Sequence, residues 1–280
     1  MWSLPKPRYT AQETYEAAIS KVRDKNLHAV YRAATRTVAQ ASSGYAAAAE
    51  HGVAHALLEK DFAVKGVTRG QMISLYDSRM AHKRGPARYV YDAIRAAAPY
   101  NRCPLCGHRD VGTLDHVMPK TKFPALAVTP LNLVPSCHEC NKRKGNQVAA
   151  SAHTAAVHPY YDTFDNDRWL QATVVQQRPA AVRFFVEPPQ HWAEADQARA
   201  RHHFDSYGLG ALYTAQAAQD LAHLGYRLER LANDSGPEGV RSYLVEEAES
   251  YRFARLNSWQ TAMYTALGDS DWYWNGGFSM

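Results

Sequence analysis

Two matched pairs of cysteines constrain the fold of this chain more than any other feature. The motifs C-P-L-C at 103–106 and C-H-E-C at 137–140 contain all four cysteines of the 280 residues, and about thirty residues separate them. Each Cys-x-x-Cys turn offers two thiolates to one ion, and two turns complete the tetrahedral set of structural zinc. Redox-active cysteines are the alternative, but two matched pairs favour a metal. We therefore predict a zinc site formed by Cys103, Cys106, Cys137 and Cys140.

A zinc ion held in this way closes its coordination sphere with protein ligands, so its role is structural rather than catalytic. By analogy with zinc fingers, it would contribute about 10 kcal/mol or more to the folding of a short, loop-rich segment. Three histidines lie close enough in the sequence to replace one cysteine as a ligand, although none is required: His108, His116 and His138.

The overall composition is that of a globular protein with 46% hydrophobic residues. No apolar run approaches the roughly 18 residues of a spanning helix, so no membrane association is expected. The first residues lack the apolar stretch of a secretory signal, which favours the cytoplasm, where thiols remain reduced. A net charge of +5 suits a polyanionic partner without requiring one.

Helical patterns flank the cysteine-rich segment on both sides. Thr10 and Glu13, and later Thr68 and Gln71, have the spacing of capping boxes that begin helices. Between them, residues 27–60 are rich in alanine and favour a helix.

After the central segment, residues 172–175 and 181–186 form two β-rich runs that predict a hairpin. Helical patterns resume at 193–231, and Ser235 with Pro237 predicts a last helix that runs to about Leu267. The sequence thus predicts a mainly α (α+β) protein with three parts: a helical region at 1–100, a zinc-bound module at 101–149, and a hairpin followed by helices at 150–280.

The module also carries residues suited to phosphodiester hydrolysis, a reaction that needs a base for water and a cation against the phosphate. Asp115 and Asn141 offer oxygen donors, which suit Mg²⁺ or Mn²⁺ better than zinc. His116 has an ordinary pKa near 6.5, so it could accept the proton of an attacking water at neutral pH, with a rate that rises through about pH 6 to 7. Adjacent strand residues point to opposite faces, so Asp115 and His116 need a strand end or a distortion to converge.

The motif L-D-H-x-x-P-K at 114–120, followed by N-L-V-P-x-C-x-x-C-N-x-x-K at 132–144, resembles the HNH (ββα-metal) endonuclease family, in the branch with two zinc-binding Cys pairs. The resemblance implies a β-hairpin with the Asp-His pair at the end of its first strand, and then a helix that carries Asn141. It implies that His116 is the general base, that Asp115 and Asn141 hold one divalent metal, and that Asn132 braces the loop. A glycine-rich turn that many members have is replaced here by F-P-A-L at 123–126.

The resemblance further implies a metal-dependent endonuclease acting on nucleic acid, with DNA as the expected substrate. Its relatives take part in restriction and anti-phage defence, in several cases beside an ATPase partner. Four basic residues of the module are expected to contact phosphates: Lys120, Lys142, Arg143 and Lys144. The alternative for the last three is a solvated helix face, but their position directly after Asn141 favours phosphate contact.

Two other interpretations stay open at this point. One is a non-catalytic zinc module that binds nucleic acid or a protein partner, against which the intact trio of Asp115, His116 and Asn141 argues. The other is a nuclease that is inactive until a partner remodels its flanks.

Overall fold

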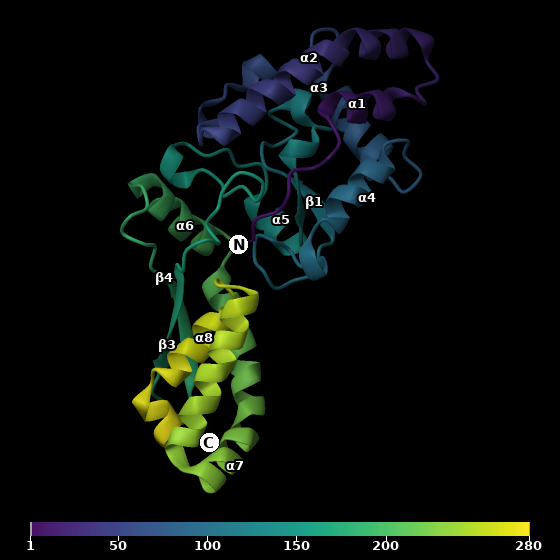
Figure 1. The fold of residues 1–280 in the computed structure, drawn as a ribbon. Helices are drawn as coiled ribbons and strands as arrows, with labels where there is room; N and C mark the ends of the chain where they lie inside the picture. The colour runs from purple at the N-terminus through teal and green to yellow at the C-terminus, as the bar shows by residue number, and fades with distance from the viewer. Residues whose placement is uncertain (1, 280) are drawn as a thin grey trace. The chain divides into compact units, whose positions relative to one another are not determined.

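The chain folds into two compact units, residues 1–163 and 164–280. The computed structural model describes residues 2–279 (Figure 1). Both units consist mainly of helices, and in the described residues each contains a two-stranded antiparallel sheet. The predicted class, mainly α within α+β, is confirmed. The first unit contains the N-terminal helices together with the cysteine-rich segment.

The helices of the first unit begin where the sequence predicts. Both capping boxes form, with Thr10 before α1 (Ala11–Ile19) and Thr68 before α3 (Arg69–Ser74). The alanine-rich stretch forms α2 (Lys25–Glu50), which ends ten residues earlier than expected. Gly52 follows with a φ of 70°, a left-handed conformation that terminates helices.

Shorter helical segments complete this part of the chain. They are the 3₁₀ turns η1 (Ala54–Ala56) and η2 (Glu59–Phe62), the π-helix η3 (Leu75–Ala81), α4 (Arg88–Ala96) and the 3₁₀ turn η4 (Pro99–Asn101).

The cysteine-rich segment has the ββα topology that the resemblance implies. Strand β1 (Thr113–His116) pairs antiparallel with β2 (Leu133–Ser136), and α5 (His138–Lys144) follows and packs against β1. The connection between the strands contains the 3₁₀ turns η5 (Pro124–Leu126) and η6 (Pro130–Asn132). A further turn, η7 (Ala152–Thr154), comes after α5.

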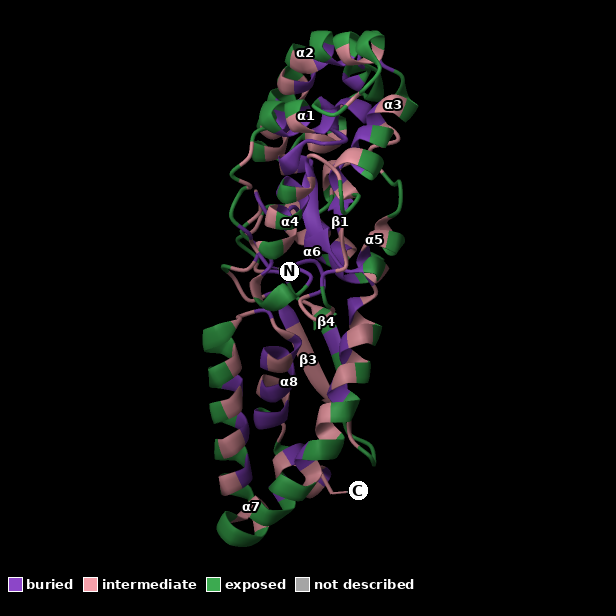
Figure 2. Cartoon of the chain, turned by 90° about the vertical axis from the view of Figure 1, so that its right-hand side faces the viewer, coloured by how far each residue is buried: buried purple, intermediate pink, exposed green. Residues whose placement is uncertain are grey.

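One hydrophobic core joins the N-terminal helices to the ββα segment. Tyr15, Val38 and Met72 from the helices belong to the same buried cluster as Phe123 and Leu133 from the ββα segment. Figure 2 shows β1 buried among the inner faces of these helices. The helices therefore form one wall of the ββα segment rather than a separate domain.

The second unit contains the predicted hairpin, β3 (Leu170–Val175) paired with β4 (Ala181–Val186). Helix α6 (Glu194–Ser206) follows it, and Gly208 then takes a left-handed conformation at the start of α7 (Leu209–Ala254). Helix α7 is sharply kinked at Gly236, where φ is 70°.

The chain ends with α8 (Trp259–Gly268) and the π-helix η8 (Tyr273–Gly277). The prediction of one helix from Ser235 to Leu267 is wrong, because the chain becomes extended at Arg255 and Ser258 caps a new helix. Among the described residues, no helix combines the length and apolarity that crossing a bilayer requires.

Asn257, in the break between α7 and α8, should be the most sensitive polar residue of the second unit. Its buried side chain accepts hydrogen bonds from the backbone N–H groups of Trp169 and Leu170, and donates one to the Asp167 carbonyl. Asn257→Ala would leave these backbone groups unsatisfied, so we expect a loss of about 3 kcal/mol in the free energy of unfolding. Asn275→Ala, at an exposed position, is the matched control and should change it by less than about 1 kcal/mol. Denaturant titration measures both, and equal losses would contradict the assignment.

Candidate active site and zinc centre

The four cysteines lie together as a site that fits zinc. Their sulfur atoms are all within 4.8 Å of one another, and all four side chains are buried and free of disulfides. With Zn–S bonds of about 2.3 Å, the sulfurs of a tetrahedral site lie about 3.8 Å apart, which this arrangement accommodates. The cluster contains no histidine, so the alternatives in which a histidine replaces a cysteine are not needed.

Local hydrogen bonds shape both cysteine turns. Gly107 takes a left-handed φ of 62°, and its N–H donates to the Cys103 carbonyl at 2.7 Å. The backbone N–H of Arg109 points at the Cys106 sulfur at 3.5 Å, and that of Cys140 points at the Cys137 sulfur at 3.3 Å. Because the first turn precedes β1 and the second begins α5, an ion here would tie the hairpin to the helix.

Asp115 is held in the interior at the end of β1. Its side chain is 4% exposed, and Oδ1 lies 3.5 Å from the Lys144 ammonium. Its other oxygen, Oδ2, is buried and has no hydrogen-bond partner among the described residues. Burial raises the pKa of this carboxyl to about 6, against the opposing effect of Lys144. An orphaned carboxylate oxygen in the interior is where a cation ligand would be expected.

His116, the last residue of β1, is oriented by the loop that joins the strands. Its Nε2 lies 2.8 Å from the Ala127 carbonyl, which can only accept a hydrogen bond, so Nε2 carries the proton and Nδ1 can receive one. The ring packs edge-on against Tyr76, with centroids 4.4 Å apart.

The expectation of an ordinary pKa for this imidazole is wrong. Burial, aided by the positive charges of Lys120 and Lys144, lowers the pKa of His116 to about 3 against the opposing effect of the hydrogen bond to the Ala127 carbonyl. The ring is therefore neutral at physiological pH, and a rate that rises through pH 6 to 7 would not report its titration.

Asn132 is fully buried at the end of the segment that joins β1 to β2. Its Oδ1 accepts a hydrogen bond from the Met118 N–H at 2.7 Å, while its Nδ2 donates to the carbonyls of Met118 and Leu126. These bonds join both ends of the segment between the strands.

Asn141 lies on α5, one helical turn before Lys144. Residues three apart share a helix face, and the Lys144 ammonium reaches the Asp115 carboxylate and the His116 carbonyl. Asn141 is therefore on the side of α5 that faces the end of β1.

The four basic residues expected to contact phosphates differ in their surroundings. Lys142 is exposed, and Arg143 is half-exposed in an ion pair with Glu139 one turn away. Lys120 pairs with Asp77 and lies over the Tyr76 ring. The Lys144 side chain is only 9% exposed, and its ammonium already contacts the Asp115 carboxylate and the His116 carbonyl.

Sequence reasoning missed Tyr76 and the Ala127 carbonyl. Tyr76 comes from η3, outside the motif, and its hydroxyl donates to the Leu114 carbonyl while its ring contacts His116. Its place at a buried helical position was visible in the sequence, but its contact with His116 depends on tertiary packing. A backbone carbonyl has no sequence signature.

Comparison with known proteins agrees with this geometry. The family profile described as HNH endonuclease matches residues 103–147. The chain therefore belongs to the HNH endonuclease family. The presence of this domain is consistent with nuclease activity in general. The chain is also similar to Protein ea31 of Escherichia phage lambda, with 30% identity over 239 residues that cover 79% of each protein. That similarity extends well beyond the HNH segment. No solved structure matches the chain.

The zinc site predicts the metal content of the purified protein. We expect about one zinc per chain by elemental analysis, and Cys137→Ser should lose it, because serine does not supply a thiolate. The loss should unfold the ββα segment, visible as a lower melting temperature of the first unit. A folded, zinc-free Cys137→Ser protein would contradict the structural role.

The burial of His116 predicts that its imidazole ring stays neutral in the folded protein. In the protein without added divalent metal, ¹⁵N resonances of this ring should show the neutral Nε2–H form from about pH 5 to 8, because burial disfavours the charged ring. Since the folded pKa lies below the unfolded value, this group's contribution to stability is present at neutral pH and is lost as the pH falls below about 6.5. A ring that titrates near pH 6.5 would contradict the prediction.

Proposed function

We propose that this chain is a metal-dependent endonuclease that hydrolyses phosphodiester bonds, with DNA as its substrate. One observation carries the proposal. The Ala127 carbonyl fixes one nitrogen of His116 and leaves Nδ1 to act as a base, and the preceding residue of β1, Asp115, has a buried carboxylate oxygen without a partner among the described residues. A module that only binds nucleic acid has no need for this pair.

In the proposed reaction, Nδ1 of His116 takes the proton from the attacking water. The hydrogen bond to Ala127 fixes both the tautomer and the orientation of the ring. Burial keeps the imidazole neutral, and a phosphate anion bound beside it would raise its pKa toward a useful range. Asn132 supports the loop that carries the Ala127 carbonyl, so we assign it a bracing role.

The Asp115 carboxylate and the Asn141 amide oxygen would hold Mg²⁺ or Mn²⁺, since hard cations prefer oxygen ligands. The buried Oδ2 atom without a partner fits this role. Such an ion supplies charge neutralisation to the phosphate and the leaving oxygen. Lys142, exposed on α5, and Arg143 would contact the substrate backbone, together with Lys120.

A single assay tests the proposal and its alternative. Purified protein is incubated with Mg²⁺, with Mn²⁺ or with EDTA, on supercoiled plasmid, single-stranded DNA and RNA. We expect cleavage of DNA that EDTA abolishes and that Mg²⁺ or Mn²⁺ restores without added zinc. Binding without cleavage under every condition would instead support the non-catalytic zinc module. Restriction or defence, an ATPase partner and a cytoplasmic location stay predictions from the sequence.

The base assignment predicts the size of one effect. A general base contributes about 10²–10⁴-fold to the rate. Because His116→Ala removes Nδ1, the proposed proton acceptor, it should lower the single-turnover rate by that factor at saturating metal. Zinc content and affinity for DNA should remain close to those of the wild type, because the thiolates and the basic residues are unchanged. His153→Ala, at an exposed position of the same unit, is the matched control and should keep the full rate. Equal rates for wild type and His116→Ala would remove this residue from the mechanism.

A further inference from the structure

The outer face of helix α2 lacks acidic residues almost entirely. Its 26 residues contain one carboxylate, Glu50 at the last position, and that group pairs with Lys6. Exposed helices of soluble proteins ordinarily carry both signs of charge. The exposed residues of α2 before Glu50 are instead basic, uncharged polar or small, apart from the aliphatic Val30: Lys25, Asn26, Ala29, Val30, Arg32, Ala33, Arg36, Thr37, Gln40, Ser43, Gly44 and Ala47.

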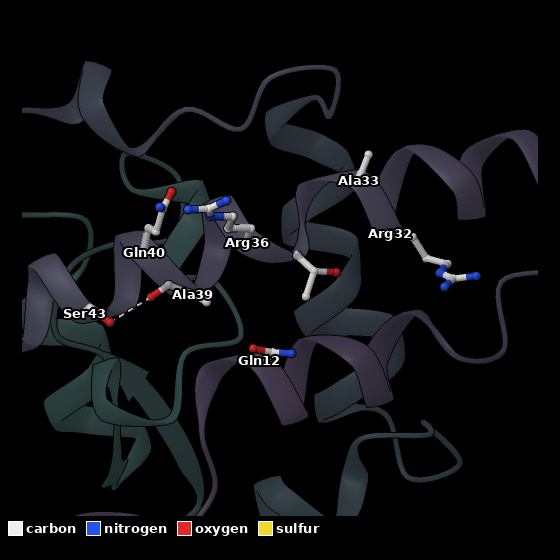
Figure 3. A pocket seen from close by; sticks show the side chains of 8 residues that line it. Gln12, Arg32, Ala33, Arg36, Ala39, Gln40 and Ser43 are labelled. Carbon is white, nitrogen blue, oxygen red and sulfur yellow. Dashed lines mark hydrogen bonds between the residues drawn. The ribbon is translucent and has the colours of Figure 1, made fainter.

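A groove of about 500 Å³ runs along this face beside α1. Arg32 and Arg36, one helical turn apart on α2, line it, and Gln12 lines it from α1 (Figure 3). Thr35, Gln40 and Ser43 add further polar groups. No carboxylate lines the groove. Of the two acidic residues that follow Gln12 on α1, Glu13 is held by Thr10 in the capping box, and Glu16 accepts a hydrogen bond from the Gln12 amide. Neither arginine forms an ion pair with another of the described residues.

The charges of the chain are divided between its two units. Lysine and arginine outnumber aspartate and glutamate by 22 to 12 in residues 1–163, whereas in residues 164–280 the acidic residues outnumber the basic ones by 15 to 10. The modest net charge of +5 therefore conceals a strongly basic first unit. A polyanion is attracted to this unit, which also contains the active site.

We propose that the groove formed by Arg32 and Arg36 on α2 binds the phosphate backbone of the nucleic acid substrate, at a distance along the chain from the HNH segment. This proposal rests on the proposed function and specifies where that substrate is held. Guanidinium groups pair with phosphate oxygens, and amide and hydroxyl groups donate to them as well. The exposed alanines and Gly44 let a backbone approach the helix closely. An open groove lined by two arginines and several uncharged polar side chains suits a polymer better than a small ligand, which prefers an enclosed pocket.

Direct binding to a DNA duplex tests this proposal without depending on cleavage. The measurements use the full-length His116→Ala protein, which removes the proposed base, and compare it with the same protein carrying Arg32→Gln and Arg36→Gln. Each lost phosphate contact lowers the slope of log K against log salt by about 0.9, so the double change should lower it by about 2, for every DNA sequence alike. Arg32→Lys with Arg36→Lys should retain most of the slope, because the charge remains.

The matched control is Arg201→Gln with Arg230→Gln, which removes the same charge from exposed positions of the second unit. This pair should leave the slope unchanged. An unchanged slope in the α2 variant, or an equal decrease in the control, would overturn the proposal that the groove binds the phosphate backbone, even if the wild-type protein cleaves DNA. A decrease specific to α2 would support the groove even if no cleavage were found, so the two proposals fail separately. Thermal unfolding of each variant verifies that the exposed substitutions leave the fold intact.

Discussion

The chemistry of the site depends on the burial of Asp115 and His116 by elements outside the HNH motif. Tyr76 packs against the His116 ring, and Phe123, in the loop, belongs to the same core as the N-terminal helices. Loss of water acts oppositely on the two groups, because it disfavours the charged form of each: the pKa of Asp115 rises to about 6 and that of His116 falls to about 3. A cation bound to the Asp115 carboxylate would therefore stabilise its charged form. The His116 ring stays neutral, so one of its nitrogens can accept a proton. Both properties come from packing.

Much of this arrangement was predictable from the sequence because its determinants are local. The short motifs carry the family resemblance that implies the ββα topology, and the capping boxes at Thr10 and Thr68 begin helices where they were expected. The failures have tertiary causes. The helix expected to reach Leu267 ends because the Asn257 side chain binds the backbone of β3, which is remote in sequence. The pKa of His116 could not be predicted either, since desolvation depends on which side chains surround the ring.

The same limit explains why the basic residues of the motif do not act alike. Lys142 and Lys144 are two residues apart and look equivalent in the sequence, but they lie on different faces of α5. One is exposed and available to a phosphate, whereas the other is 9% exposed against Asp115. Helical period alone would separate the two faces, and the position of β1 decides which of them is inside.

Lys144 also shows how the site keeps its charges balanced. A buried carboxylate without a cation is costly, and the ammonium 3.5 Å from Asp115 Oδ1 offsets part of that cost. The same ammonium donates a hydrogen bond to the His116 carbonyl at 2.5 Å, so it would remain anchored to the end of β1 if a divalent ion took over the neutralisation of Asp115. The lysine then links α5 to β1, and Asn141, three residues earlier, lies on the same face of that helix. A buried ammonium that binds a carboxylate and a carbonyl at once therefore does for Asp115 what the Ala127 carbonyl does for His116: it restricts the orientation of a side chain of the candidate site through a fixed neighbour.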